Sequence, residues 1–334
     1  MTRLIAIHGP EELLTWKAAG PIPSLSPADL TRHAPDAHAL LIAADGTTAG
    51  RCSLWWRQAP PVTGERLGVI GHYAAQDSEA GHTLLRHACE QLVGAGCTLA
   101  VGPMDGSTWR RYRLITDRGS DPPFFLEPSH PAEWVRHFAD AGFSPWIGYE
   151  STVVDRLAAE DPRLSEVQTR LAAGGIGIRS LDLAHVEPDL RRIYAVTIAS
   201  FVKSPLYLPM PEAEFLDLYR PMLPHVRPEL VLLAEDGDGP VGFVFGVPDL
   251  LQPQRGVPID TVIIKTVAVL PGRSTAGLGG LLVARCHAAA RRLGFARAIH
   301  ALMHERNVSR NISSERARPI RRYALFARRL GEPV

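Results

Sequence analysis

The sequence predicts a mixed α/β protein built from two successive domains that repeat one order of elements. The chain has 334 residues, against ~100–200 residues in a typical domain. A hairpin, a strand, a helix and a further strand follow one another once in each half. The strands do not simply alternate with helices, so the sheets are expected to be mixed rather than wholly parallel.

In the first half, the elements follow from local apolar patterns. Two apolar, β-prone runs flank a glycine-containing turn and predict a hairpin. The helix after the next strand ends in glycine, as helices commonly do. The predicted elements are a hairpin over 40–56, a strand over 66–75, a helix over 79–97 and a strand over 98–104.

The boundary between the two predicted domains lies between Asp155 and Gly177. A short polar helix over about 161–173 ends at Gly174 and Gly175. Paired glycines after a helix indicate a C-cap and a chain reversal. We therefore assign residues 1–155 to a first domain, 156–175 to a linker helix, and 176–334 to a second domain.

In the second half, the elements have stronger signals. One helix has apolar residues near helical spacing, and another begins with Pro211 and early acids, as the helix dipole favours. The turn Gly237-Asp238-Gly239 indicates a hairpin. The predicted elements are strands over 176–183, 230–236, 240–247, 262–270, 296–303 and 321–330, and helices over 188–201, from 211, and over 278–295.

Composition excludes several classes of protein. Hydrophobic residues make up 46% of the chain and charged residues 21%, which is typical of a globular protein. No apolar run approaches the ~18–20 residues that span a bilayer, and the N-terminus lacks the apolar core of an export signal. The four cysteines have neither CxxC nor zinc-ligand spacing, so no metal or disulfide framework is expected. We expect a cytoplasmic protein.

Charge is unevenly distributed although the net charge is only +1. The first 155 residues are acidic overall, and residues 265–334 are strongly basic. A basic block often faces an anion, but it is also a common solvated surface. Aromatic residues are sparse in this block and no nucleic-acid motif occurs, so we expect no nucleic-acid partner.

The strongest functional signal is the loop VLPGRSTAGLGG, residues 269–280, between a predicted strand and a helix. Glycines at 277, 279 and 280 let backbone amides approach a ligand without an intervening Cβ. Such amides, together with the helix dipole, form an anion site suited to a diphosphate. The loop is neither a P-loop nor a GxGxxG fingerprint. From the glycines alone, close packing explains the loop equally well.

These residues resemble the acetyl-CoA loop of the GCN5-related N-acetyltransferases, V-x-P-x-x-(Q/R)-x-x-G-x-(G/A). Val269, Pro271, Gly277 and Gly279 fall at the expected offsets, whereas Ser274 occupies the Gln/Arg position. The resemblance covers about residues 176–330 and implies an α/β (α+β) fold. In it, two tandem domains each have a mixed, mostly antiparallel central sheet flanked by helices.

The resemblance also implies a set of cofactor contacts. The coenzyme A diphosphate is expected on the loop, and the pantetheine arm is expected to pair with the strand edge at Val267 and Val269. Asn307 is expected to contact the arm, although a turn or an N-cap also explains this asparagine. The expected loop residues are Arg273, Ser274, Thr275, Ala276, Gly277, Leu278, Gly279 and Gly280.

Acid and base candidates lie on or after the fifth strand of the second domain. The family's usual acid, a tyrosine seven residues after the asparagine, is replaced by Ser314, so Tyr323 is a substitute candidate or simply a packing aromatic. Glu305 and His304 are the best base candidates, with His300 a third. A solvated acid or a buried strand histidine explains these residues as well. No HExxH order is present, so no metal is expected.

In the first half, the corresponding loop has one glycine where the second has three, so phosphate binding is expected to be poor there. Residues 130–143 resemble the family's closing helix, and residues 102–114 resemble part of a degenerate tandem half. We expect a first domain that scaffolds or shapes the substrate site. Trp55, Trp56 and Trp109 line that site or simply pack in the core.

The function predicted from the sequence is acetyl transfer from acetyl-CoA to a primary amine of a small molecule or peptide by direct attack. The alternative is a non-catalytic acyl-CoA-binding sensor or interaction module, which differs in turnover and not in cofactor affinity. The chain is expected to be a monomer, as a pseudo-dimer of its two domains, or a homodimer. Lys265, a cation within an apolar strand, stays unassigned.

Overall fold

The computed structural model describes residues 2–16, 22–157, 164–305 and 317–331. Elements up to residue 154 form the first half of the molecule. They are β1 (Arg3–Ile7), α1 (Pro10–Thr15), α2 (Pro27–His33), β2 (Ala37–Ile42), β3 (Thr48–Trp55), β4 (Leu67–Ala75), α3 (Ser78–Gly94), β5 (Leu99–Gly102), β6 (Leu114–Asp117), α4 (Trp134–Asp140) and β7 (Ser144–Val154).

Elements from residue 164 onward form the second half. They are α5 (Leu164–Ala173), β8 (Gly177–Ser180), α6 (Val186–Phe201), α7 (Glu212–Tyr219), β9 (Val231–Asp236), β10 (Gly239–Pro248), β11 (Thr261–Val269), α8 (Leu278–Arg292), β12 (Arg297–His304) and β13 (Ala317–Arg329).

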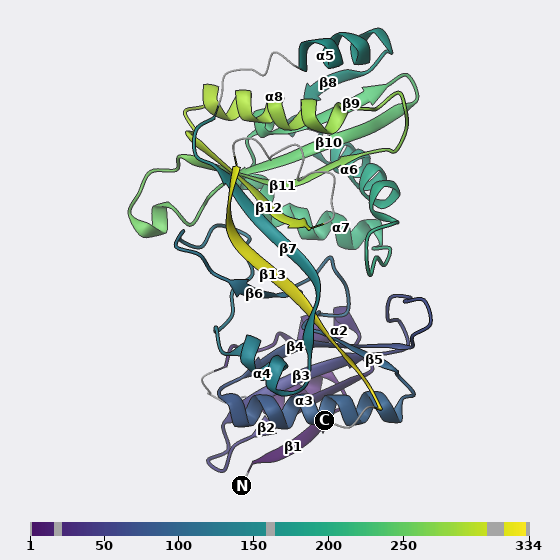
Figure 1. Ribbon diagram of the computed structural model, residues 1–334, viewed down its shortest axis with the longest axis vertical. Coiled ribbons are helices and arrows are strands. Elements are labelled where there is room, and N and C mark those ends of the chain that lie inside the picture. Colours follow the sequence, from purple (N-terminus) through teal and green to yellow (C-terminus); the bar gives the residue numbers. More distant parts are fainter. Residues whose placement is uncertain (1, 17–21, 158–163, 306–316, 332–334) are drawn as a thin grey trace.

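The described strands join into one continuous, mostly antiparallel sheet that runs through both halves (Figure 1). Its order is β1-β2-β3-β4-β5-β13-β7-β12-β11-β10-β9-β8, and β6 pairs with β13 off this path. Parallel pairing occurs between β4 and β5 and between β11 and β12, once in each half. The predicted fold class, a mixed and mostly antiparallel sheet flanked by helices in each of two tandem units, is therefore confirmed.

The two halves exchange strands at the centre of the sheet. β7, from the first half, pairs antiparallel with β12, and β13, from the end of the chain, pairs antiparallel with β5. β7 and β13 also pair with each other, with Tyr149 opposite Tyr323, and form the crossing in Figure 1. The division at residues 155 and 176 stays a prediction. The exchange shows that a strand from each half pairs with strands of the other.

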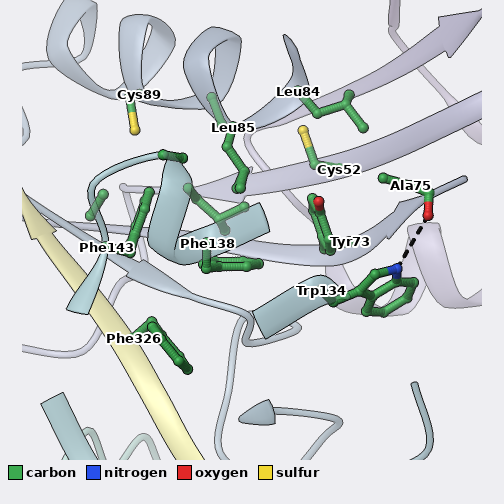
Figure 2. Packing of buried hydrophobic residues seen from close by; sticks show 14 of the residues in the cluster. Cys52, Tyr73, Ala75, Leu84, Leu85, Cys89, Trp134, Phe138, Phe143 and Phe326 are labelled. Carbon is green, nitrogen blue, oxygen red and sulfur yellow. Dashed lines mark hydrogen bonds between the residues drawn. The ribbon is translucent and has the colours of Figure 1, made fainter. Parts of the chain in front are cut away.

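Hydrophobic cores lie on both faces of the sheet. In the first half, α3 and α4 cover a core that contains Tyr73, Trp134 and Phe138. Figure 2 shows Phe326 of β13 reaching this core, so the exchanged strand contributes packing as well as backbone pairing. In the second half, α6 and α7 pack on one face of the sheet, and α5 and α8 pack on the other.

The structure confirms the strands and helices predicted on either side of the glycine-rich loop. It adds β1, α1, α2, β6 and β7, which the sequence patterns did not predict. β7 lacks the alternation of a half-exposed strand because Glu150, Ser151 and Thr152 are all buried within it. None of the helices in the described residues is both long enough and apolar enough to cross a membrane.

Candidate active site

In the second half, β11 and β12 diverge beside the glycine-rich loop. They pair in parallel from Thr261 opposite Arg297 to Ile264 opposite His300. Beyond this point β11 continues along β10 to Val269, whereas β12 shifts register and continues along β7. In the described part of the chain, no segment pairs with the β12-facing edge of β11 beyond Ile264. A strand edge with unpaired backbone groups therefore leads to the loop.

Lys265 occupies a β-bulge where the two strands part. Thr266 lies opposite Phe245 and Ile264 opposite Gly246, so Lys265 is the extra residue of β11. Bulges re-aim a side chain out of the regular pleat. The Lys265 ammonium donates a hydrogen bond to the Tyr219 hydroxyl at 3.1 Å and lies 4.7 Å from the centre of that ring. Lys265, which the sequence analysis left unassigned, thus lies where β11 begins to diverge from β12.

The loop after β11 is held by the buried Thr275, whose hydroxyl donates to the carbonyls of Leu270 at 2.8 Å and Gly272 at 3.1 Å. α8 then begins after Gly277, which has φ +81° and provides no side-chain cap. No acidic residue lies in the first turn of α8. The first N–H groups of a helix lack an intrahelical acceptor, so this uncapped turn suits an anion.

The linker helix α5 packs against this loop. The Arg170 guanidinium donates a hydrogen bond to the Ala276 carbonyl. A Cβ on Gly277 would lie 2.9 Å from Val167 Cγ1, and the positive φ of Gly277 already disfavours a side chain. A glycine is therefore required at 277 by both backbone conformation and space.

The structure brings the predicted cofactor residues together along one path. Val267 and Val269 lie half-buried on β11 at its diverging end, and the predicted loop residues lead from there into the first turn of α8. Arg273 and Ser274 are exposed at the outer side of the loop. Asn307 and Ser314 lie outside the described residues.

In the first half, the equivalent features are occupied by the chain itself. Parallel pairing of β4 with β5 ends at Val69. The next β4 groups bind the segment after β5, because the Met104 N–H donates to the Ile70 carbonyl at 2.8 Å and the His72 N–H to Asp105 Oδ1 at 2.5 Å. The strand edge that is unpaired in the second half is thus filled here.

The first turn of α3 is also unlike that of α8. The Asp77 carboxylate accepts a hydrogen bond from the Ala80 N–H at 2.8 Å and so caps the helix. Glu79 adds a second carboxylate at the helix position that Gly279 holds in α8. Two carboxylates at a helix N-terminus repel a phosphate. Poor phosphate binding in this half stays a prediction.

The two predicted bases lie on opposite faces of the sheet. His304 is opposite Tyr149, and their rings are 5.4 Å apart at centroid. Glu305 lies over Gly148, whose carbonyl accepts its N–H at 3.1 Å, and any side chain at Gly148 would collide with the Glu305 carboxylate. Their partners Tyr149 and Gly148 are successive residues of β7 and face opposite sides of the sheet, so His304 and Glu305 do not converge on one reacting atom.

Tyr323 is buried on β13, which β7 separates from β12. Its hydroxyl donates to Glu127 Oε1 at 2.9 Å and contacts the Ser151 hydroxyl at 3.0 Å. Ser151 Oγ in turn accepts the Leu302 N–H at 2.9 Å. Burial raises the pKa of the Tyr323 phenol. Tyr323 therefore reaches the divergent part of β12 through Ser151.

His300, the third base candidate, is 5% exposed on β12 and lies against α8. Its Nε2 is 2.9 Å from Nε2 of His287. Burial lowers the pKa of His300 to about 3 and the pKa of His287 to about 4. Both imidazoles are therefore neutral in the folded protein at neutral pH.

This histidine pair predicts a loss of stability in mild acid. An unfolded histidine takes up a proton near pH 6.5, which the folded pair resists until about pH 4. The stabilisation is therefore complete above pH 6.5 and should fall by ~1.4 kcal/mol per pH unit per histidine below it. Denaturant unfolding at pH 7 and pH 5 measures this change. The free energy of unfolding of the His287→Leu/His300→Leu double variant should depend less on pH than that of the wild type. An unchanged dependence would contradict the assignment of this pH effect to the buried histidine pair.

The described residues include no group of three or more His, Cys, Asp or Glu side chains arranged to hold a metal ion. Their four cysteines are free and buried, and burial raises the pKa values of the Cys52, Cys89 and Cys286 thiols. A thiol held in its protonated form is a poor nucleophile. The candidate site is the divergence of β11 and β12 with the adjoining turn of α8.

No known family profile matches the sequence, and no curated protein sequence does. Solved structures share its fold. A GCN5-related N-acetyltransferase from Sphaerobacter thermophilus has a TM-score of 0.51 and 15% identity, covering 99% of this chain and 97% of that one. A tandem GNAT protein from the clavulanic acid biosynthesis pathway has a TM-score of 0.51 and 12% identity, covering 100% of both chains.

A conserved protein of unknown function from Enterococcus faecalis V583, described as a probable N-acyltransferase, has a TM-score of 0.54 and 10% identity. The match covers 99% of this chain and 73% of that one. The chain thus has the fold of the GCN5-related N-acetyltransferases in its tandem form.

Proposed function

We propose that this protein is an acetyl-CoA-dependent N-acetyltransferase. Its second half would hold acetyl-CoA and pass the acetyl group directly to a primary amine of a small molecule or peptide. The observation that carries the proposal is the divergence of β11 from β12 beside an uncapped, glycine-rich helix start. A fold alone does not define an activity, so the argument rests on this site.

The residues present fit coenzyme A. The amides of residues 273–280 and the dipole of α8 would hold the diphosphate, because no carboxylate lies in that turn. The edge of β11 at Val267 and Val269 offers backbone groups to the pantetheine amides in the manner of an added strand. The first half offers neither feature, since its own carboxylates and backbone fill both places.

Acetyl-CoA supplies a thioester, whose C–S bond breaks as the bond from the acceptor nitrogen to the carbonyl carbon forms. An alkylamine has a pKa of ~10.4 and must lose a proton to become a nucleophile. His304 or Glu305, directly or through water, would accept that proton, a role typically contributing ~10²–10⁴ in rate. Because the two side chains lie on opposite faces, only one of them can serve a given acceptor.

We assign the first half a supporting role at the acceptor side. Its segment after β5 packs on the second half, where the Trp109 indole donates to the Leu208 carbonyl at 2.7 Å. Arg110 and Glu214 form an ion pair across the same contact at 2.8 Å. Trp109 and Arg110 would shape the acceptor pocket from this side.

Release of free thiol from acetyl-CoA in the presence of an amine panel tests the proposal. We expect amine-dependent thiol release and an acetylated product identified by mass spectrometry. Acetyl-CoA binding without thiol release for any amine would instead favour the acyl-CoA-binding module. Absence of acetyl-CoA binding would overturn both functions.

A further inference from the structure

Arg113 is a buried cation between the two halves. It follows β5 in the segment that packs against the second half, and it is only 6% exposed. Its guanidinium carbon lies 3.8 Å from the centre of the Tyr112 ring and 4.0 Å from the centre of the Tyr149 ring. The two rings are nearly perpendicular, at 85°, with their centres 5.6 Å apart. The two rings therefore cover adjoining sides of the guanidinium and do not sandwich it.

The N–H groups of the Arg113 guanidinium have few hydrogen-bond partners. Nη1 donates to the Leu302 carbonyl at 3.3 Å, and Nε is buried without a hydrogen-bond partner. Among the described residues, no carboxylate lies within ion-pair distance of this guanidinium, although neighbouring Arg110 and Arg111 pair with Glu214 and Asp105. Arg113 therefore carries a buried charge without a counter-charge in the described part of the chain.

A second buried arginine, Arg321, has both a counter-charge and hydrogen-bond acceptors. Arg321 pairs with the Glu127 carboxylate at 2.8 Å and also donates to backbone carbonyls. A buried unpaired charge is costly, and stacking on aromatic rings offsets only part of that cost. The Nε and Nη2 edge of a guanidinium matches the two oxygens of a carboxylate or phosphate. In Arg113, the Nε donor of this edge is buried without a hydrogen-bond partner.

Arg113 also lies beside the divergence of β11 and β12. Leu302, which accepts its hydrogen bond, is two residues beyond the last parallel pair and has φ +59°. Tyr149, whose ring packs against Arg113, contacts the His304 ring as well. An anion bound to the free edge of Arg113 would thus lie next to a candidate base.

We propose that Arg113 determines acceptor specificity by binding an anionic group, carboxylate or phosphate, carried by the amine substrate. The inference rests on the proposed acetyltransferase function and names the class of its acceptor. The amine would then be held at a fixed distance from its anionic end, near the diverging strands.

Matched pairs of amines test this assignment. Lysine against cadaverine and ornithine against putrescine differ by a carboxylate, and phosphoethanolamine against ethanolamine differs by a phosphate. We expect the wild type to prefer the anionic member of at least one pair in kcat/KM. Arg113→Met should reduce kcat/KM for the preferred anionic member by about 10- to 100-fold and leave its partner nearly unchanged. Arg113→Lys, which keeps charge without the fork, should fall between.

Arg111→Gln is the matched control, because Arg111 lies two residues away, is partly exposed and pairs with Asp105. It should keep the preference of the wild type. Equal loss for both members of each pair in Arg113→Met would indicate a structural role and overturn the assignment, as would a wild type without any anion preference.

A second readout separates this inference from the proposed function. The preferred anionic amine should raise the thermal midpoint of the wild type and of Arg111→Gln but not that of Arg113→Met, whether or not turnover occurs. If turnover is absent but this shift is seen, the anion site stands and the acetyltransferase function fails. If turnover is present without the shift or the preference, the function stands and the anion site fails.

Discussion

Replacement of Gly279 by glutamate is expected to weaken acetyl-CoA binding by about 100-fold or more. Gly279 is the second residue of α8, where the diphosphate would meet the first helical amides. A carboxylate about 5 Å from one phosphate charge costs roughly 3 kcal/mol at an effective dielectric constant of ~20, so the dissociation constant should rise by about 100-fold or more. An acidic residue in the first turn favours the helix itself, so the fold should persist. Calorimetric titration measures the change.

The first half provides the matched controls. Glu79 already occupies the corresponding position of α3, and Ser78 is exposed at the start of that helix. Glu79→Gly and Ser78→Asp should each leave acetyl-CoA affinity unchanged. Wild-type affinity in Gly279→Glu would remove α8 from the cofactor site, and loss of affinity in the α3 variants would move the site to the first half.

Replacement of Glu127 by alanine is expected to destabilise the protein by about 3–5 kcal/mol. Glu127 and Arg321 form an ion pair at 2.8 Å in which each side chain is 3% exposed. Glu127 also accepts the Tyr323 hydroxyl at 2.9 Å. Truncation would leave a buried guanidinium without its counter-charge and a buried phenol without its acceptor. Denaturant unfolding measures the change in the free energy of unfolding.

An exposed ion pair calibrates this measurement. Asp29 and Arg32 pair at 2.7 Å on α2, with both side chains largely solvated. Asp29→Ala should change the free energy of unfolding by less than about 1 kcal/mol. If Glu127→Ala also lowered the free energy of unfolding by less than about 1 kcal/mol, the buried pair would not anchor β13 to the first-half segment that carries Glu127.

The glycine-rich loop was predictable because its information is local. A β-branched strand, Pro271, three glycines and an apolar helix follow one another without interruption, and the structure places them in that order. The bulge at Lys265 was not predictable in the same way. It depends on the register between β11 and β10, although a lone lysine in an apolar strand was a visible anomaly.

The strand exchange depends on pairing between distant segments, which no local pattern encodes. β7 lies inside the sheet, between β12 and β13. Its polar residues are therefore buried and do not mark a solvent-exposed face. The environment of Arg113 could not be predicted from the sequence either, because Tyr112 precedes it in the chain whereas Tyr149 comes from β7. The opposite orientation of His304 and Glu305 was hidden too, because the predicted strand ended at residue 303 and the orientation depends on their partners Tyr149 and Gly148 on β7.

The most direct test of the central claim is the number of acetyl-CoA molecules bound per wild-type chain, measured by equilibrium dialysis with labelled acetyl-CoA. One half has an uncapped helix start and an unpaired β11 edge, and the other fills both positions with its own residues. We therefore predict one site per chain. Two sites, or none, would contradict the assignment of cofactor binding to the second half alone.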